Sequence, residues 1–355
     1  MPSPATLEVL RNCALALAGA VVLLSLLLLV ERMVAAAVAR GVRRREAELA
    51  PLVYEAIHDS AVPHPILGKL TRFDRQVVRG ILLRLALDLR GDTGERIAAL
   101  YEGLGLLQAD EARLRSWGGS RRARAAMDLG LIRAMPALPA LLGALDDGDT
   151  RVRQAAAWAV GQVADREALL VLIRLLGDQS SVVARRAQEV LADRGREIED
   201  ALLSYAGEAA SRVGRLRAIE LLGWLRVADS VELLLRLMND ADSEIRIKVV
   251  KAATAIGDPR FLEPFHHALE DSQWEVRCQA ARGLSVLGSP LSVPRLSRAL
   301  RDPQWWVRFY AAVALAEVGA VGKAALTDAV EGRPSPAHDM ARYLLERGSA
   351  VPALP

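Results

Sequence analysis

Hydrophobic residues follow two different patterns along this chain. From Cys13 to Val30 the sequence CALALAGAVVLLSLLLLV contains 18 residues without a charge. As a helix, such a run spans about 27 Å, close to the hydrocarbon thickness of a bilayer. From residue 118 onward, apolar and small residues recur instead at intervals of three and four, as in amphipathic helices that bury one face. The patterns predict one transmembrane helix followed by a long series of packed helices.

The helical part repeats with a period of 31 residues, as in DSQWEVRCQAARGLSVLG from Asp271 and DPQWWVRFYAAVALAEVG from Asp302. Counting back from Arg308 at this spacing, six of seven positions are Arg, and five of the six positions that lie six residues earlier are Asp. One unit departs from the series, because Ala184 replaces Arg and Ala209 replaces Asp. Each unit is expected to be a helix, a turn with Asp and a second helix with Arg in its first turn. Such pairs must stack to bury their apolar faces.

This repeat resembles the HEAT family. Pro294, Asp302, Val307 and Arg308 match the HEAT pattern of Pro, then Asp eight residues later, then Val-Arg. The resemblance implies an all-α fold, an α-solenoid of stacked helix pairs. It also implies that the recurrent Asp and Arg side chains form a hydrogen-bonded ladder through the turns, with a structural role and not a catalytic one. The ladder residues are Asp147, Arg153, Asp178, Asp240, Arg246, Asp271, Arg277, Asp302 and Arg308.

Basic residues around the apolar run predict its orientation. Arg11 alone precedes it, whereas five arginines follow closely, and Lys and Arg favour the cytoplasmic side. The membrane-proximal basic residues are Arg40, Arg43, Arg44 and Arg45. We therefore expect a single-pass protein of the cytoplasmic, inner membrane, with its N-terminus outside and its repeats in the cytoplasm. The alternative is a signal peptide cleaved near residues 35–39; the length of the run, and a preceding segment in which Glu8 and Arg11 leave no net positive charge, favour a retained anchor.

The expected organisation has five parts. A short extracytoplasmic N-terminus (1–12) leads into the transmembrane helix (13–31). A basic juxtamembrane and helical N-cap region (32–90) precedes the HEAT solenoid (91–348), and a tail (349–355) ends the chain. Within the N-cap region, FDRQVVRGILLRLALDLRG predicts a helix with Arg72, Arg75, Arg79 and Arg84 on its polar side. This helix is interpreted either as a cap of the solenoid or as a surface for another membrane protein.

Candidate functional residues are sought among positions that do not repeat. Trp305, Trp306, Phe309 and Tyr310 lie within six residues, although aromatic residues are 4% of the chain. They are candidates for partner binding, since Trp and Tyr often anchor interfaces. The alternative is that they pack beneath the last helix and cap the core. In HEAT proteins the second helix of each pair lines the concave side, which predicts exposed, ligand-facing positions at Arg185, Gln279, Arg282 and Tyr310.

Composition argues against several classes of function. A net charge of +3 over 355 residues is small for a nucleic-acid-binding protein. The two cysteines form no disulfide framework, and His266-His267 has no further ligand at metal-binding spacing. The sequence contains no phosphate-binding loop, nucleophile elbow or HExxH motif. We therefore expect no enzyme activity, no cofactor, no metal and no nucleic-acid partner.

Residues 1–120 are also similar to bacterial membrane-anchored HEAT proteins that accompany membrane glycosyltransferases in cell-surface polysaccharide systems. The similarity implies a scaffold with a protein partner, itself a membrane protein. Two alternatives remain open. HEAT-like lyases attach bilin chromophores to phycobiliproteins, and other solenoids bind DNA along a basic concave groove. The DNA-binding alternative requires concentrated positive charge on the concave helices.

Overall fold

The computed structural model describes residues 4–58, 70–163, 166–208 and 211–347, and in these residues every regular element is a helix. The predicted all-α fold is therefore confirmed. The chain divides into two compact units, unit 1 (residues 1–137) and unit 2 (residues 138–355). The predicted tail, 349–355, and the ladder position Ala209 lie outside the described residues.

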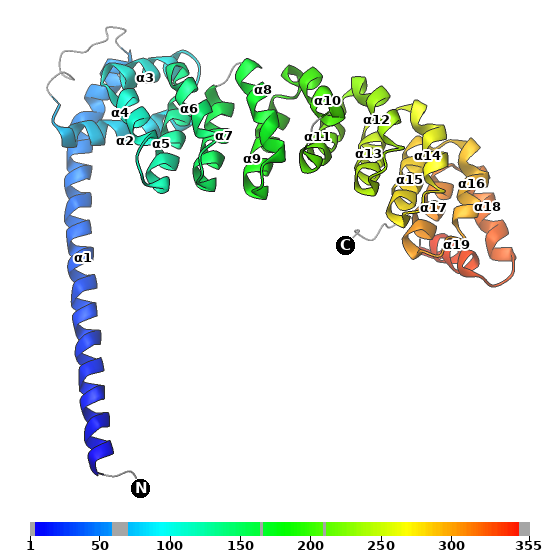
Figure 1. Ribbon diagram of the computed structural model, residues 1–355, viewed down its shortest axis with the longest axis horizontal. Coiled ribbons are helices and arrows are strands. Elements are labelled where there is room, and N and C mark those ends of the chain that lie inside the picture. Colours follow the sequence, from blue (N-terminus) through cyan, green and yellow to red (C-terminus); the bar gives the residue numbers. More distant parts are fainter. Residues whose placement is uncertain (1–3, 59–69, 164–165, 209–210, 348–355) are drawn as a thin grey trace. The chain divides into compact units, whose positions relative to one another are not determined.

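Unit 1 begins with α1 (Pro4–His58), a single helix of 55 residues that is drawn in blue in Figure 1. Its apolar stretch is exposed; for example, Leu23 and Leu27 are 60% and 58% accessible. The final turns instead bury Leu49, Val53 and Ile57. The helix is long and apolar enough to cross a membrane, a property that an N-terminal signal sequence shares. One helix thus joins a candidate membrane span to the core of unit 1.

The described part of unit 1 contains four further α-helices and a short 3-10 turn. They are α2 (Arg72–Asp88), α3 (Asp92–Gly103), α4 (Leu106–Leu114), α5 (Gly119–Ile132) and η2 (Met135–Ala137). Thr71 and Asp74 form a capping box that fixes the start of α2. From α2, Val78 and Leu82 are fully buried and face a core that includes Leu100 of α3 and Leu129 of α5.

Unit 2 consists of helix pairs. The first helices are α6 (Leu138–Ala144), α8 (Arg166–Arg174), α10 (Glu199–Glu208), α12 (Val231–Leu237), α14 (Leu262–Ala268), α16 (Val293–Ala299) and α18 (Ala320–Glu331). The second helices are α7 (Thr150–Val163), α9 (Ser181–Asp193), α11 (Arg212–Leu225), α13 (Ser243–Ile256), α15 (Trp274–Leu287), α17 (Trp305–Glu317) and α19 (Pro336–Arg347). Short 3-10 turns precede or follow several of them: η3 (Leu175–Gly177), η4 (Gly195–Glu197), η5 (Ala228–Ser230), η6 (Pro259–Phe261) and η7 (Pro290–Ser292).

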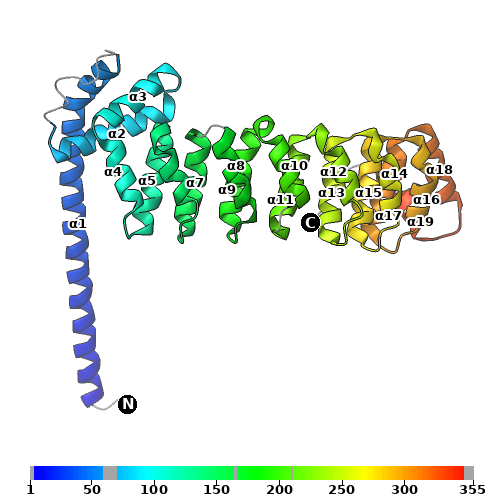
Figure 2. The same cartoon turned by 45° about the horizontal axis from the view of Figure 1, so that its top comes forward.

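The second helices of unit 2 lie side by side in one row and the first helices in another (Figures 1 and 2). Within this unit, the row of second helices follows the inner side of the curve in Figure 1. We call the exposed surface of α7, α9, α11, α13, α15 and α17 the inner face. The solenoid predicted from the 31-residue period is therefore present, and its inner face is the surface that a long ligand could follow.

Small residues permit close packing between successive second helices. A side chain added at Gly223 of α11 would place its Cβ 2.7 Å from the Cα atom of Ala252 in α13. Gly257 and Gly288 end α13 and α15 in the left-handed region, with φ values of 72° and 58°. After α17 the C-cap is Val318, and the next residue, Gly319, is the N-cap of α18.

Candidate functional site

The predicted ladder residues meet in the turns of unit 2. Arg277 donates from Nε and Nη2 to the two carboxylate oxygens of Asp302 in the next repeat, at 2.7 and 3.0 Å. Its Nη1 donates to the carbonyl oxygen of Asp271 in its own turn, at 2.8 Å. Each Asp in turn accepts a bond from an amide at the start of the following helix, such as Asp302 from the amide of Gln304 at 2.8 Å. Each Arg–Asp pair therefore joins two consecutive turns.

The same geometry recurs at Arg153 with Asp178 and at Arg246 with Asp271. Arg308 is the last Arg of the series; it bonds only the carbonyls of its own turn, and its buried Nε has no partner among the described residues. At the interruption, Ala184 is fully buried in α9. There Arg217 of α11 donates to the carbonyl of Leu176, at 2.7 Å, and supplies a different link between repeats.

The aromatic cluster lies at the start of α17 and contacts α19. Trp305 stacks on Phe309 with ring centroids 5.1 Å apart, and Trp306 stacks on Tyr310 at 6.4 Å. The ring of Tyr343 in α19 lies 6.4 Å from that of Phe309. Phe309 and Tyr310 are buried, whereas Trp305 is 39% exposed. Trp305 and Trp306 therefore supply the surface of the cluster, and its role in partner binding stays a prediction.

A groove of about 290 Å³ opens on the inner face between α11, α13 and α15. Trp224 lines it and is 61% exposed. The same groove is lined by Lys248, Lys251 and Arg282. Lys248 Nζ forms an ion pair with Glu220 Oε1 at 2.6 Å. We call this surface the inner-face groove. It combines one large apolar side chain with an excess of positive charge.

The inner face differs in part from the expected ligand-facing positions. Arg185 and Arg282 are exposed, as expected, but Gln279 and Tyr310 are 5% and 4% accessible. The expected exposure is therefore wrong for both positions; Tyr310 is covered by packing within the solenoid, whereas Gln279 still lines the inner-face groove. Trp224 was missed. It occupies the same position in the repeat as Ala255 and Val286, so only its size, and not its place in the pattern, could have indicated it.

The predicted membrane-proximal arginines have different surroundings. Arg43 and Arg44 are exposed, and Arg40 bonds a carbonyl of its own helix. Arg45 instead donates from Nε to the buried carboxylate of Asp74 in α2, at 2.6 Å. The hydrogen bonds from Arg45 and Thr71 hold the pKa of Asp74 well below its usual range. Arg45 therefore fastens α1 to α2, a role that its place in a basic run did not reveal.

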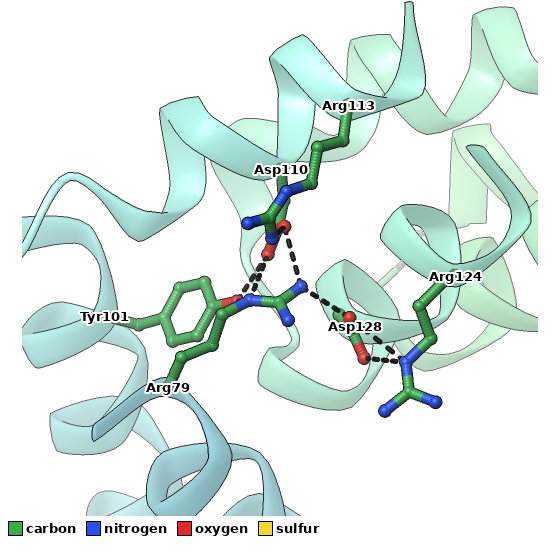
Figure 3. Close-up of polar contacts among 6 residues, drawn as sticks. All are labelled: Arg79, Tyr101, Asp110, Arg113, Arg124 and Asp128. Carbon is green, nitrogen blue, oxygen red and sulfur yellow. Dashed lines mark hydrogen bonds and ion pairs between the residues drawn. The ribbon is translucent and has the colours of Figure 1, made fainter. Parts of the chain in front are cut away.

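Unit 1 contains a buried cluster of charged residues (Figure 3). Arg79 of α2 donates from Nη2 to Asp110 of α4, at 2.7 Å, and to Asp128 of α5, at 2.5 Å. Both carboxylates are buried, with 0% and 1% of their surface accessible. Arg79 was expected on a polar, exposed face; its side chain is 17% exposed because it reaches between three helices. The two Asp residues were not identified from the sequence.

Neighbouring groups complete the hydrogen bonding of the cluster. Tyr101 donates its hydroxyl to Asp110, and burial together with the charge of Asp110 raises the pKa of Tyr101 far above its usual range. Arg113 donates to Asp110 at 2.6 Å, and Arg124 donates to Asp128 at 3.2 Å. Burial raises the pKa of Asp128 above its usual value, although Arg79 and Arg124 oppose this shift. Every carboxylate of the cluster therefore has at least two partners.

Cys278 and the neighbouring pair His266 and His267 form no metal-binding cluster with other described residues. Burial raises the pKa of the Cys278 thiol to about 11, so the nucleophilic thiolate is scarce at neutral pH. His266 is buried and bonds Glu263 and Ser292 at 3.1 and 2.9 Å. These contacts are those of a satisfied core histidine.

Stacked helix pairs joined by an Asp–Arg ladder define an α-solenoid. The sequence pattern of HEAT repeats matches residues 107–192, 199–273 and 262–347. Because these segments cover more than half of the chain, the protein belongs to the HEAT-repeat family. The family resemblance predicted from the Pro, Asp and Val-Arg spacing is confirmed.

Solved structures share the solenoid fold at low sequence identity. Importin beta, crystallised with ammonium sulfate, is 13% identical with a TM-score of 0.51, over 85% of this chain and 46% of that one. A mutant of Kap121p is 15% identical with a TM-score of 0.51, over 79% of this chain and 37% of that one. The CpcE–CpcF complex of phycocyanin lyase from a Nostoc species is 20% identical over 68% of this chain and 93% of that one, with a TM-score of 0.30.

These likenesses show the fold alone, and this chain spans less than half of the importin-beta and Kap121p chains. The TM-score of 0.30 provides no argument for lyase activity. No curated protein matches the chain.

Proposed function

We propose that this protein is a membrane-anchored, non-enzymatic scaffold whose repeats hold a protein partner at the cytoplasmic face of the inner membrane. The observation that carries this proposal is the continuity of α1. The same helix exposes a stretch long enough to cross a bilayer and then enters the core of unit 1. The ion pair between Arg45 and Asp74 and the one between Arg84 and Glu46 support a firm attachment of the helix to unit 1.

The inner-face groove is the proposed docking surface for the partner. An exposed Trp beside Lys251 and Arg282 suits an acidic protein segment that carries an apolar side chain. Basic residues of the inner face are accompanied by acids, as in Lys248 with Glu220 and Arg186 with Glu189. This mixture of charges favours a protein partner over duplex nucleic acid, which requires concentrated positive charge.

We propose an integral-membrane enzyme as the partner, and a glycosyltransferase of cell-surface polysaccharide synthesis as its class. The class rests on the sequence resemblance of residues 1–120. A second contact surface for such a partner is available on α2, where Phe73 and Leu87 are 46% and 56% exposed. Both are apolar side chains on the helix that is fastened to the base of α1.

Affinity purification in a mild detergent tests the proposal. We compare the full-length chain with a chain that lacks residues 1–39 and retains Arg45. The proposal expects one integral-membrane enzyme to be recovered with the full-length chain and lost with the truncated one. Recovery of the same soluble proteins with both chains would contradict it.

A matched pair of substitutions then tests the groove. Trp224→Ala removes an exposed Trp from the groove, whereas Trp117→Ala removes one that is 90% exposed on unit 1. Loss of an interface anchor costs about 2 kcal/mol or more. We therefore expect Trp224→Ala to weaken partner binding about 30-fold, with little effect from Trp117→Ala. If the Trp224→Ala and Trp117→Ala variants bind the partner equally well, the groove is not the docking surface.

A further inference from the structure

A pocket of about 580 Å³ lies above the buried charge cluster of unit 1, between α2, α4 and α5. Four arginines line it, together with two serines. They are Arg79, Arg113, Arg121, Arg124, Ser116 and Ser120. We call it the arginine pocket. Neither the HEAT-repeat fold nor the proposed scaffold function requires four arginines to line one pocket.

The charges around the arginine pocket do not cancel. Asp110 and Asp128 lie buried beneath it, and each already accepts bonds from two arginines. Four guanidinium groups against two carboxylates leave an excess of two positive charges at the pocket. Neighbouring like charges repel each other, and a bound anion would offset that repulsion.

Two side chains of the pocket have no hydrogen-bond partner in the described part of the chain. Among the described residues, none accepts a hydrogen bond from the guanidinium of Arg121, which is exposed at the rim. The Oγ atom of Ser116 is buried and also has no partner in the described part of the chain. Helix α5 begins at Gly119, beside the pocket, and its N-cap residue Gly118 provides no capping side chain. The guanidinium of Arg121, the hydroxyl of Ser116 and the start of helix α5 are all groups of a kind that binds anions.

The buried aspartates also orient the outer arginines. Arg113 and Arg124 are 42% and 73% exposed, but each is held on its inner side by a buried carboxylate, Asp110 and Asp128 respectively. Figure 3 shows both guanidinium groups attached to the cluster in this manner. Side chains that are ordered before binding lose less conformational entropy when a ligand arrives.

We propose that the arginine pocket binds a phosphate group. A phosphomonoester carries a charge of about −1.5 to −2 at pH 7, which matches the excess of two positive charges. Its tetrahedral oxygens accept paired N–H bonds from planar guanidinium groups, which are the preferred residues for this recognition. The phosphate can belong to a soluble ligand or to a lipid headgroup, and the two sources share the same chemistry.

The test uses the full-length chain in uncharged detergent micelles at constant ionic strength. Inorganic phosphate is titrated by calorimetry as the soluble probe. Native mass spectrometry of protein mixed with phosphatidic acid, with phosphatidylcholine as the uncharged comparison, is the lipid probe. Arg121→Ser removes a guanidinium that has no acceptor within the described part of the protein, and Arg96→Ser removes the same charge from an exposed site on α3 outside the pocket.

We expect saturable binding of at least one probe, weakened about tenfold or more by Arg121→Ser and nearly unchanged by Arg96→Ser. Binding of inorganic phosphate alone identifies a soluble ligand. If the protein retains phosphatidic acid and added inorganic phosphate then displaces it, the ligand is identified as a lipid headgroup. The proposal is overturned if neither probe binds saturably, or if the two variants weaken binding equally, since that result reflects net charge and not a site.

Discussion

Arg246 and Asp271 lie 25 residues apart in the sequence and form a two-point ion pair across neighbouring repeats. The Nε–Oδ2 and Nη2–Oδ1 distances are 2.8 and 2.9 Å, and Nη1 of the same Arg bonds the carbonyl of Asp240 at 2.8 Å. One side chain therefore joins its own turn to the next. This relationship explains why Asp and Arg recur together with the period of the repeat.

Replacing Arg246 with Ala should destabilise unit 2. The substitution leaves the carboxylate of Asp271 and a turn carbonyl without their charged donor, and we expect a loss of about 2 kcal/mol in the free energy of unfolding. Urea denaturation followed by circular dichroism measures the effect. Arg301→Ala, which removes an exposed Arg, is the control. A variant at position 246 as stable as this control would show that the ladder does not stabilise the fold.

Acid should weaken the ladder. Partial burial raises the pKa of Asp271. The hydrogen bonds that it accepts from Arg246 and from the amide of Gln273 outweigh burial and hold the pKa below its usual range. A depressed folded pKa contributes stability that is present above the unfolded pKa of about 4 and is lost as pH falls through the folded value.

The free energy of unfolding should therefore decrease between about pH 4 and pH 2. Asp271→Asn removes one titrating group, so the variant should start from a lower stability and lose less of it over the same range. Urea titrations at several pH values provide the comparison. Parallel pH profiles for the two proteins would contradict this role of Asp271.

Gly223→Ala should separate α11 from α13. The added methyl group would lie 2.7 Å from the Cα of Ala252, and backbone cannot move aside as a flexible side chain can. Overpacking of this kind costs about 1 to 3 kcal/mol. Gly143→Ala is the matched control in α6, because its Cβ would have no atom within 4 Å. The control should be neutral or slightly stabilising, since Ala favours a helix. Thermal unfolding of both variants tests the contrast.

The tryptophans at the surface of α17, exposed Trp305 and half-buried Trp306, should respond to substitution differently from the buried Phe309. Phe309→Ala removes a buried ring that contacts Tyr343, and we expect a loss of about 3 to 5 kcal/mol. Limited proteolysis should then cleave near α19 much faster. Replacing Trp305 and Trp306 with Ala should either expose the same end to protease or weaken one protein interaction without faster cleavage. The second outcome would assign the cluster to an interface.

Periodicity explains which features the sequence could predict. Arg153, Arg246 and Arg277 were identified because each occupies the same position in a repeat, and the helical spacing determined which face is buried. The part of unit 1 before residue 118 offers no such register. The link between Arg79 and Asp128 joins residues 49 apart on helices that do not repeat each other, so only the three-dimensional structure reveals it. Trp224 shows a related limit, because the repeat pattern does not indicate in which unit a position carries a large exposed side chain.

Anchoring by α1 is the central claim, and the intact mass of the protein in alkaline-washed membranes tests it most directly. Carbonate at high pH removes peripheral proteins, whereas a spanning helix stays in the bilayer. The account predicts that the membrane pellet contains the uncleaved chain of 38.4 kDa, apart from processing of the first residue. A shorter chain that begins near residues 35–39 and is released into the soluble fraction would identify a cleaved signal peptide and contradict the anchored scaffold.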